Sequence, residues 1–201
     1  MGHKAWAENA KTILESAIKN NIEYLTLWAL STENLTNRDP EEIKAIIKLI
    51  DNIENLLWEA LENNVRFLTI WNTSLLPKKS QDTLEKIIEK TKKNTGTTVT
   101  IALVYGGQDE IIRAIHNATI KWEDMSTITL ETLHTYLDTH ILPLPDLIIR
   151  TGWDTRHSWF LLFDSAYSEY YFTQKKWPEF SESDFLDAIE TFLKAKRNFG
   201  K

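Results

Sequence analysis

The sequence predicts an α/β fold, with a mainly parallel central sheet and helices on both faces. Short apolar runs alternate along the chain with amphipathic segments of ten or more residues, which are the crossovers that parallel strands need. The chain has 201 residues, of which 42% are hydrophobic, enough for one domain with a sizeable core. No repeat, linker or low-complexity segment divides it, so we expect a single domain over residues 1–201.

The first half of the chain is expected to contain three strands and three helices. Apolar residues at spacings of three and four predict a helix over residues 3–20. The runs YLTLWAL (24–30), VRFLTIW (65–71) and TVTIALVY (98–105) predict strands buried on both faces. Asp39-Pro40-Glu41-Glu42 is typical of a helix start, and the isoleucine-rich residues 41–63 continue that helix. Residues 77–94 predict another helix, which Asn94-Thr95-Gly96 closes.

The second half continues the alternation. Helices are predicted from residue 107 to 121, from 130 to 140 and from 182 to 198. Strands are predicted for DLIIR (146–150), around SWFLLF (158–163), and in the aromatic segment that holds Glu169.

Composition excludes several classes of function. The 23 Lys and Arg against 29 Asp and Glu give a net charge of −6, which does not favour nucleic-acid binding. Without cysteine there are no disulfides or thiolate metal sites. No apolar run approaches the roughly 20 residues that span a bilayer, and nothing resembles a signal peptide. We therefore expect a cytoplasmic protein with at most peripheral membrane contact.

Small polar residues follow four of the predicted strands: STEN (31–34), WNTS (71–74), GGQDE (106–110) and RTG (150–152). In one parallel sheet the residues after each strand share one rim, where ligands bind. Each segment taken alone is more simply explained as a solvated turn.

Arg150 ends a buried strand, and Arg156 and Ser158 follow across the Gly152 turn. A guanidinium presents a planar fork of donors that suits phosphate oxygens. We interpret Arg150, Arg156 and Ser158 as a diphosphate clamp. The alternative is a salt-bridged loop in which Asp154 pairs with one of the arginines.

Glu169 lies among Tyr167, Tyr170, Tyr171 and Phe172. A carboxylate in an aromatic strand needs an arginine or a metal ion as a partner. Mg²⁺ commonly bridges carboxylates and substrate phosphates, although a single Glu is more often structural.

Seven segments carry longer motifs: GHKAWAENAK, YLTLWALSTEN, NVRF, NTGTTVTIALVYGGQDEI, LPDLIIRTG, R-x-S-x-F-L-L and AYSEYYFT-x-x-x-WPEF. Together they resemble the cis-prenyltransferases, the undecaprenyl diphosphate synthase or isoprenyl transferase family. The resemblance runs in order from Gly2 to Gly200. It implies a transferase that condenses isopentenyl diphosphate onto an allylic diphosphate such as farnesyl diphosphate, with cis stereochemistry. It also implies Mg²⁺ as cofactor, a polyprenyl diphosphate as product and a homodimer in which the R-x-S segment completes the neighbouring site.

The resemblance also implies roles for individual residues. Arg150, Arg156 and Ser158 match the residues that bind isopentenyl diphosphate, and Glu169 matches the metal ligand. On the allylic side, the matching residues are His3, Ser31, Glu33, Asn34 and, less directly, Arg38. The isoleucine-rich helix over residues 41–63 matches the wall of the product tunnel.

One departure from the family concerns its amino-terminal motif. Members carry a central strand ending in M-D-G-N-x-R-W-A about a dozen residues before the G-H-[KR] motif, and its Asp holds Mg²⁺. No D-G-N occurs in these 201 residues. We therefore expect an unpaired place in the sheet and little activity from these residues alone.

A second departure concerns tryptophan. Trp6, Trp71, Trp153 and Trp159 stand where the family has glycine or another small residue. Glycine beside a phosphate allows close approach and positive φ, so an indole is expected to overfill the site or displace the loop.

Two alternatives to an active enzyme remain. In the first, the chain is a catalytically deficient partner subunit of a heteromeric cis-prenyltransferase. In the second, it is an α/β module that binds prenyl diphosphate without turnover.

Overall fold

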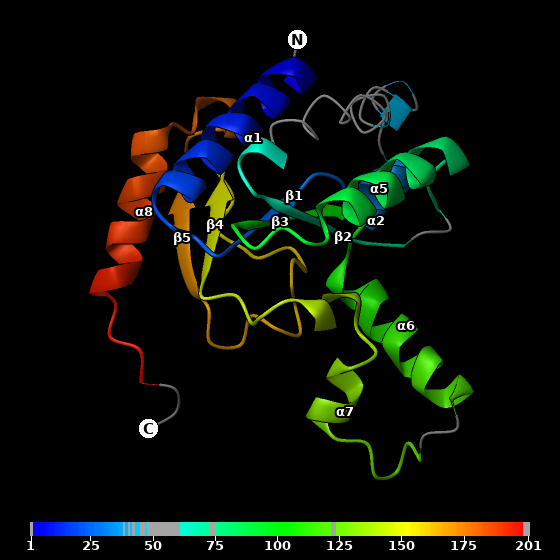
Figure 1. Ribbon diagram of the computed structural model, residues 1–201. Coiled ribbons are helices and arrows are strands. Elements are labelled where there is room, and N and C mark those ends of the chain that lie inside the picture. Colours follow the sequence, from blue (N-terminus) through cyan, green and yellow to red (C-terminus); the bar gives the residue numbers. More distant parts are fainter. Residues whose placement is uncertain are drawn as a thin grey trace. The chain divides into compact units, whose positions relative to one another are not determined.

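The computed structural model describes residues 2–37, 39, 41, 43, 44, 47, 61–72, 75–121 and 124–198, with side chains left undescribed at residues 2–4, 36 and 71 (Figure 1). It divides into two compact units. Unit 1 comprises Met1–Tyr105 and Trp177–Glu182, and unit 2 comprises Gly106–Lys176 and Ser183–Lys201.

Unit 1 contains the first three strands and the helices between them. The strands are β1 (Tyr24–Trp28), β2 (Arg66–Trp71) and β3 (Thr98–Leu103). The helices are α1 (Gly2–Lys19), α2 (Thr32–Asn37), α5 (Lys78–Thr91) and the short 3₁₀ helix η3 (Trp177–Glu179). Each strand lies within two residues of the run that predicts it.

The three strands form a parallel sheet in the order β1-β3-β2. Thr98 of the central strand pairs with Tyr24 of β1 and with Arg66 of β2. All six residues of β3 are buried, as predicted. The prediction that β1 is buried on both faces is wrong: Tyr24 is 44% exposed, and only Leu27 in the strand is buried. Among the described residues, β1 is an edge strand with one partner.

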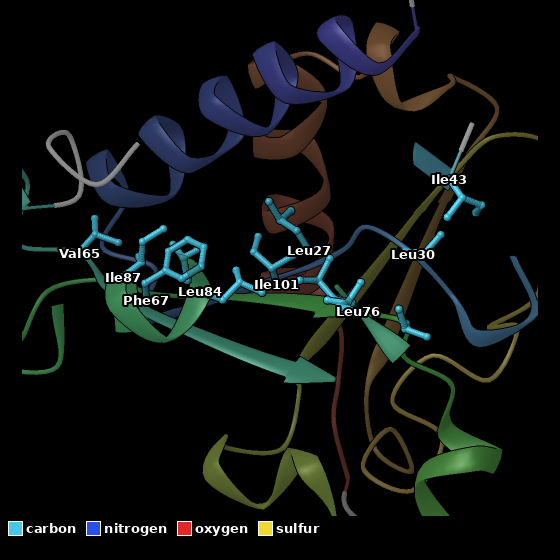
Figure 2. Packing of buried hydrophobic residues seen from close by; sticks show 12 residues of the cluster. Leu27, Leu30, Ile43, Val65, Phe67, Leu76, Leu84, Ile87 and Ile101 are labelled. Carbon is cyan, nitrogen blue, oxygen red and sulfur yellow. The ribbon is translucent and has the colours of Figure 1, made fainter. Parts of the chain in front are cut away.

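The core of unit 1 lies between this sheet and its helices. Leu84 and Ile87 of α5 lie beside Phe67 of β2, and Leu27 lies beside Ile101 (Figure 2). The i, i+3 spacing of Leu84 and Ile87 places both on one face of α5, which is why this amphipathic sequence covers the sheet.

Unit 2 contains a second, two-stranded sheet. Its strands β4 (Leu147–Thr151) and β5 (Glu169–Thr173) are parallel, with Arg150 opposite Phe172. Its helices are α6 (Gly107–Ile120), α7 (Leu130–His134), the 3₁₀ helix η2 (Asp138–Ile141) and α8 (Glu182–Lys194). The predicted helix over 130–140 is thus a short α-helix and a separate 3₁₀ turn, and α8 ends before the predicted residue 198.

The predicted strand around SWFLLF is wrong. Residues 158–164 form turns, with positive φ at Ser158, Trp159 and Leu161. The backbone N–H of Phe160 donates to His157 O, and that of Asp164 donates to Leu161 O. A strand requires extended backbone at every residue, so these residues form turns instead, and Leu161 is the apolar residue of the run that they bury.

These elements confirm a mixed α/β fold with parallel strands and helices. The described strands form two sheets, of three and of two strands, rather than one. No helix in the described ranges is long and apolar enough to cross a membrane.

Candidate functional site

Arg150 and Ser158, two members of the predicted clamp, are in direct contact. Arg150 lies at the end of β4, and its Nη1 donates to Ser158 Oγ at 2.8 Å. The Arg150 side chain is only 22% exposed. Its Nε is buried and has no hydrogen-bond partner among the described residues. The strand thus holds a guanidinium whose buried Nε donor is unused.

Asp154 joins the two arginines. Its Oδ2 lies 3.0 Å from Nη2 of Arg150 and 2.8 Å from Nη2 of Arg156. Arg156 is far more exposed than Arg150, at 66% against 22%. The three predicted clamp residues therefore lie together, and Asp154 pairs with both arginines, as the salt-bridged alternative expects.

The loop that carries the clamp turns through unusual backbone conformations. Gly152 has φ of 98° and donates its N–H to Lys175 O at 2.7 Å. Ser158 and Trp159 have φ of 48° and 65°. The left-handed region disfavours residues with a Cβ, so a tryptophan at position 159 stands where the backbone favours glycine. This agrees with the expectation that position 159 belongs to a small residue.

Helix α6 begins against the same loop. The backbone N–H of Gly107 donates to Trp159 O at 2.9 Å. A Cβ at position 107 would lie 2.6 Å from that oxygen and 2.6 Å from Leu162 Cβ. The first residue of α6 is therefore glycine because the backbones approach too closely for a side chain.

Glu169 does not join the clamp within unit 2. It opens β5 opposite Leu147, whereas Arg150 is three residues further along β4. At about 3.3 Å per residue, the two positions are about 10 Å apart along the strands. The Glu169 carboxylate is half-buried and makes no hydrogen bond or ion pair with the described residues. No group of three or more His, Cys, Asp or Glu that could hold a metal occurs in the described part of the chain.

The predicted allylic residues of unit 1 follow β1. Ser31 is buried and forms a parallel bridge with Tyr105, just beyond β3. Its Oγ accepts from the backbone N–H of Asn34 at 3.0 Å, so it caps helix α2, which also carries Glu33. Ser31, Glu33 and Asn34 thus lie together at the carboxyl edge of the three-stranded sheet.

The other predicted positions are less defined. His3 lies in the first turn of α1, and its side chain is not described. Arg38 and most of residues 41–63 lie outside the described residues, as does the side chain of Trp71. Trp6 packs on Trp177 with ring centroids 6.0 Å apart, and Trp153 is 72% exposed. The exposed Trp153 indole therefore does not fill the clamp.

The sequence interpretation missed two polar clusters in unit 2. Arg113 of α6 donates from both Nη atoms to Asp138 and from Nε to Asp109. Burial acts to lower the pKa of the Arg113 guanidinium, but the hydrogen bonds to the two carboxylates raise it. Nε2 of His134 lies 3.2 Å from Oδ1 of the buried Asp164. Only the i, i+4 spacing of Asp109 and Arg113 was visible in the sequence.

Comparison with known proteins matches the whole chain to one family. The family model described as "Putative undecaprenyl diphosphate synthase" matches residues 1–200. The isoprenyl transferase of Clostridium tetani is 41% identical over 205 residues, covering 100% of this chain and 80% of that protein. The isoprenyl transferase of Aquifex aeolicus is 37% identical over 201 residues, covering 100% of this chain and 86% of that protein.

Two solved structures are also similar. Lavandulyl diphosphate synthase from Lavandula x intermedia, in complex with dimethylallyl diphosphate, has a TM-score of 0.93 at 30% identity, covering 100% of this chain and 88% of that chain. The structure of "a probable undecaprenyl diphosphate synthase" from Campylobacter jejuni has a TM-score of 0.86 at 34% identity, covering 98% of this chain and 93% of that chain. The chain therefore belongs to the undecaprenyl diphosphate synthase family, the cis-prenyltransferases, which are prenyl-transferring enzymes.

Proposed function

We propose that the protein condenses isopentenyl diphosphate onto an allylic diphosphate such as farnesyl diphosphate, with cis stereochemistry, to make a polyprenyl diphosphate. The observation that carries the proposal is the convergence of Arg150, Arg156 and Ser158 at the end of β4. Support also comes from relatives named isoprenyl transferase and from a structural neighbour that binds dimethylallyl diphosphate.

The clamp would bind the diphosphate of isopentenyl diphosphate. Arg150 is held by Ser158, so its guanidinium is already oriented and little rotamer entropy is lost when an anion binds. Arg156 is 66% exposed, so its side chain has room to turn toward a second phosphate. Holding one substrate in a fixed orientation makes its double bond available to attack the allylic carbon.

The allylic diphosphate would bind at the carboxyl edge of the three-stranded sheet, with His3, Glu33, Asn34 and Arg38 as its contacts. Ser31 would act by positioning: its hydroxyl caps α2 and so fixes the backbone that carries Glu33 and Asn34. Ligands of parallel α/β sheets bind beyond the carboxyl ends of the strands.

Mg²⁺ is the proposed cofactor, and Glu169 is its ligand in this chain. A half-buried carboxylate with no partner among the described residues suits a cation. Mg²⁺ often takes only one or two carboxylates and completes its shell with water and substrate phosphates. When bound, the ion would neutralise the departing diphosphate.

We also propose that the two units act as one cis-prenyltransferase-like domain and that the protein works as a homodimer. The family model spans both units without interruption, which supports one domain. Ile112 and Ile120 of α6 are 66% and 62% exposed, which leaves apolar surface on this helix that a second chain would cover.

The 201 residues by themselves are proposed to turn over slowly, because no D-G-N motif lies within them to supply a second metal carboxylate. A catalytically deficient partner subunit, or a module that only binds prenyl diphosphate, would share the clamp and differ in turnover. Radiolabelled isopentenyl diphosphate and farnesyl diphosphate, supplied with Mg²⁺, separate these cases. Long-chain product at ordinary rates from the 201 residues would contradict slow turnover.

Binding tests the clamp independently of turnover. Arg150→Ala is expected to weaken calorimetric binding of isopentenyl diphosphate by tenfold or more, at about 1.4 kcal/mol per tenfold. Arg66→Ala removes an exposed arginine at the start of β2 in unit 1 and serves as the matched control. An unchanged affinity in Arg150→Ala would remove Arg150 from the clamp.

A further inference from the structure

We propose that Asp154 is an internal counter-anion of the clamp: it occupies the place of a diphosphate oxygen between Arg150 and Arg156 and lowers the clamp's affinity for anions. This inference rests on the proposed function of the clamp. One carboxylate oxygen, Oδ2, lies within 3.0 Å of both guanidinium groups, which is the geometry of a phosphate oxygen shared by two arginines.

The charges explain why this contact competes with a ligand. Two guanidinium groups carry two positive charges, and Asp154 neutralises one of them. An arriving diphosphate must displace the carboxylate or accept its repulsion at short range. Asp154 lies four residues after Arg150 and two before Arg156, so a displaced carboxylate stays tethered beside the clamp.

Displacement is sterically simple. The Asp154 side chain is 45% exposed, so a change of its χ1 rotamer can turn the carboxylate into water. Nothing lies within 4 Å of the Cβ position of Gly152, so the turn before Asp154 leaves open space on that side.

The clamp does not need Asp154 to hold Arg150. Ser158 accepts from Nη1 of Arg150 at 2.8 Å, whereas Asp154 accepts from Nη2. Removing the carboxylate would leave the Ser158 contact in place and release Nη2 alongside the buried, unpartnered Nε. If Asp154 served only to orient the arginines, its loss would weaken anion binding, so the two roles predict opposite signs.

Asp154→Asn tests the sign, because asparagine keeps an acceptor oxygen and removes the charge. Calorimetric titration with inorganic pyrophosphate is expected to show roughly three- to tenfold tighter binding than the unaltered chain, the scale of two partly exposed ion pairs. The gain should shrink at high ionic strength, where the charges are screened. Asp154→Ser provides a second variant should the asparagine form fail to fold by circular dichroism.

Asp146→Asn is the matched control. It removes the same charge from an ion pair with Arg197 in the same unit, at 2.6 Å, outside the clamp, and is expected to leave pyrophosphate affinity within about twofold of the unaltered chain. If Arg150→Ala abolishes binding while Asp154→Asn leaves it unchanged or weaker, the counter-anion role is wrong and the clamp stands. If Arg150→Ala leaves pyrophosphate binding intact, the clamp is wrong, and the counter-anion role falls with it.

Discussion

The backbone oxygen of Trp159 accepts a hydrogen bond from the backbone N–H of Gly107 at 2.9 Å, and Trp159 holds that position with φ of 65°. The clamp loop is thus fixed to the start of α6 through a residue whose own backbone conformation is unfavourable for a side chain. Ser158, the residue before it, accepts a hydrogen bond from the Arg150 guanidinium. The strain therefore lies next to the proposed binding group.

Substitution of Trp159 by glycine and by alanine separates backbone strain from loss of the indole. Both changes remove the ring, but only glycine relieves the left-handed penalty, so we expect Trp159→Gly to be more stable than Trp159→Ala by about 1 kcal/mol. Urea denaturation of the two variants measures the difference. Trp153 lies in the same loop without positive φ, and there alanine should be the more stable replacement. If alanine were the more stable replacement at both positions, the backbone at Trp159 would carry no strain.

Gly107→Ala is expected to destabilise the protein by roughly 1–3 kcal/mol, because the new Cβ meets the Trp159 oxygen and Leu162 at 2.6 Å. The melting temperature of the variant measures the loss. Gly152→Ala is the comparison: its Cβ enters open space, and only its φ of 98° opposes the change. A melting temperature equal to that of the unaltered chain in Gly107→Ala would mean that α6 and the clamp loop are not in close contact.

Trp6 and Trp177 are expected to be coupled. A double-mutant cycle with alanine at each position should give an interaction free energy of about 0.5–1.5 kcal/mol, as for other aromatic pairs. Trp177 Nε1 donates to the backbone oxygen of Trp6, a bond that survives Trp6→Ala, so the cycle reports the ring contact. Trp177→Phe keeps a ring and loses this bond. Strict additivity of the two alanine variants would contradict the packing of α1 on η3.

Arg113→Met should cost about 1–3 kcal/mol of unfolding free energy, because Asp109 and Asp138 lose a partly buried partner. Chemical denaturation measures this cost. Lys78→Met, which breaks an exposed i, i+4 pair with Asp82, is the control and should change stability little. Equal effects of the two substitutions would show that the Arg113 network contributes no more than a surface pair.

Most of the secondary structure was predictable because it depends on local periodicity. The fully buried run TVTIALVY gave the central strand β3, and the spacing of Leu84 and Ile87 gave the face of α5 that packs on the sheet. The errors occurred where apolar content does not distinguish conformations. SWFLLF is as apolar as a strand, but left-handed residues turn it back on itself.

The sequence by itself determined the family, the parallel α/β class and the candidates for the clamp, because these depend on residue types at fixed spacings. Only the tertiary structure decided which contacts those residues make. Loop conformation decides that Asp154 bridges both arginines and that Ser158 holds Arg150. Strand register decides that Glu169 opens β5 some distance from them. Neither the loop conformation nor the strand register can be read from the sequence. The turn that joins Arg150 to Ser158 includes a positive φ angle at Ser158, and residues with a side chain adopt such angles only when the surrounding structure holds them there.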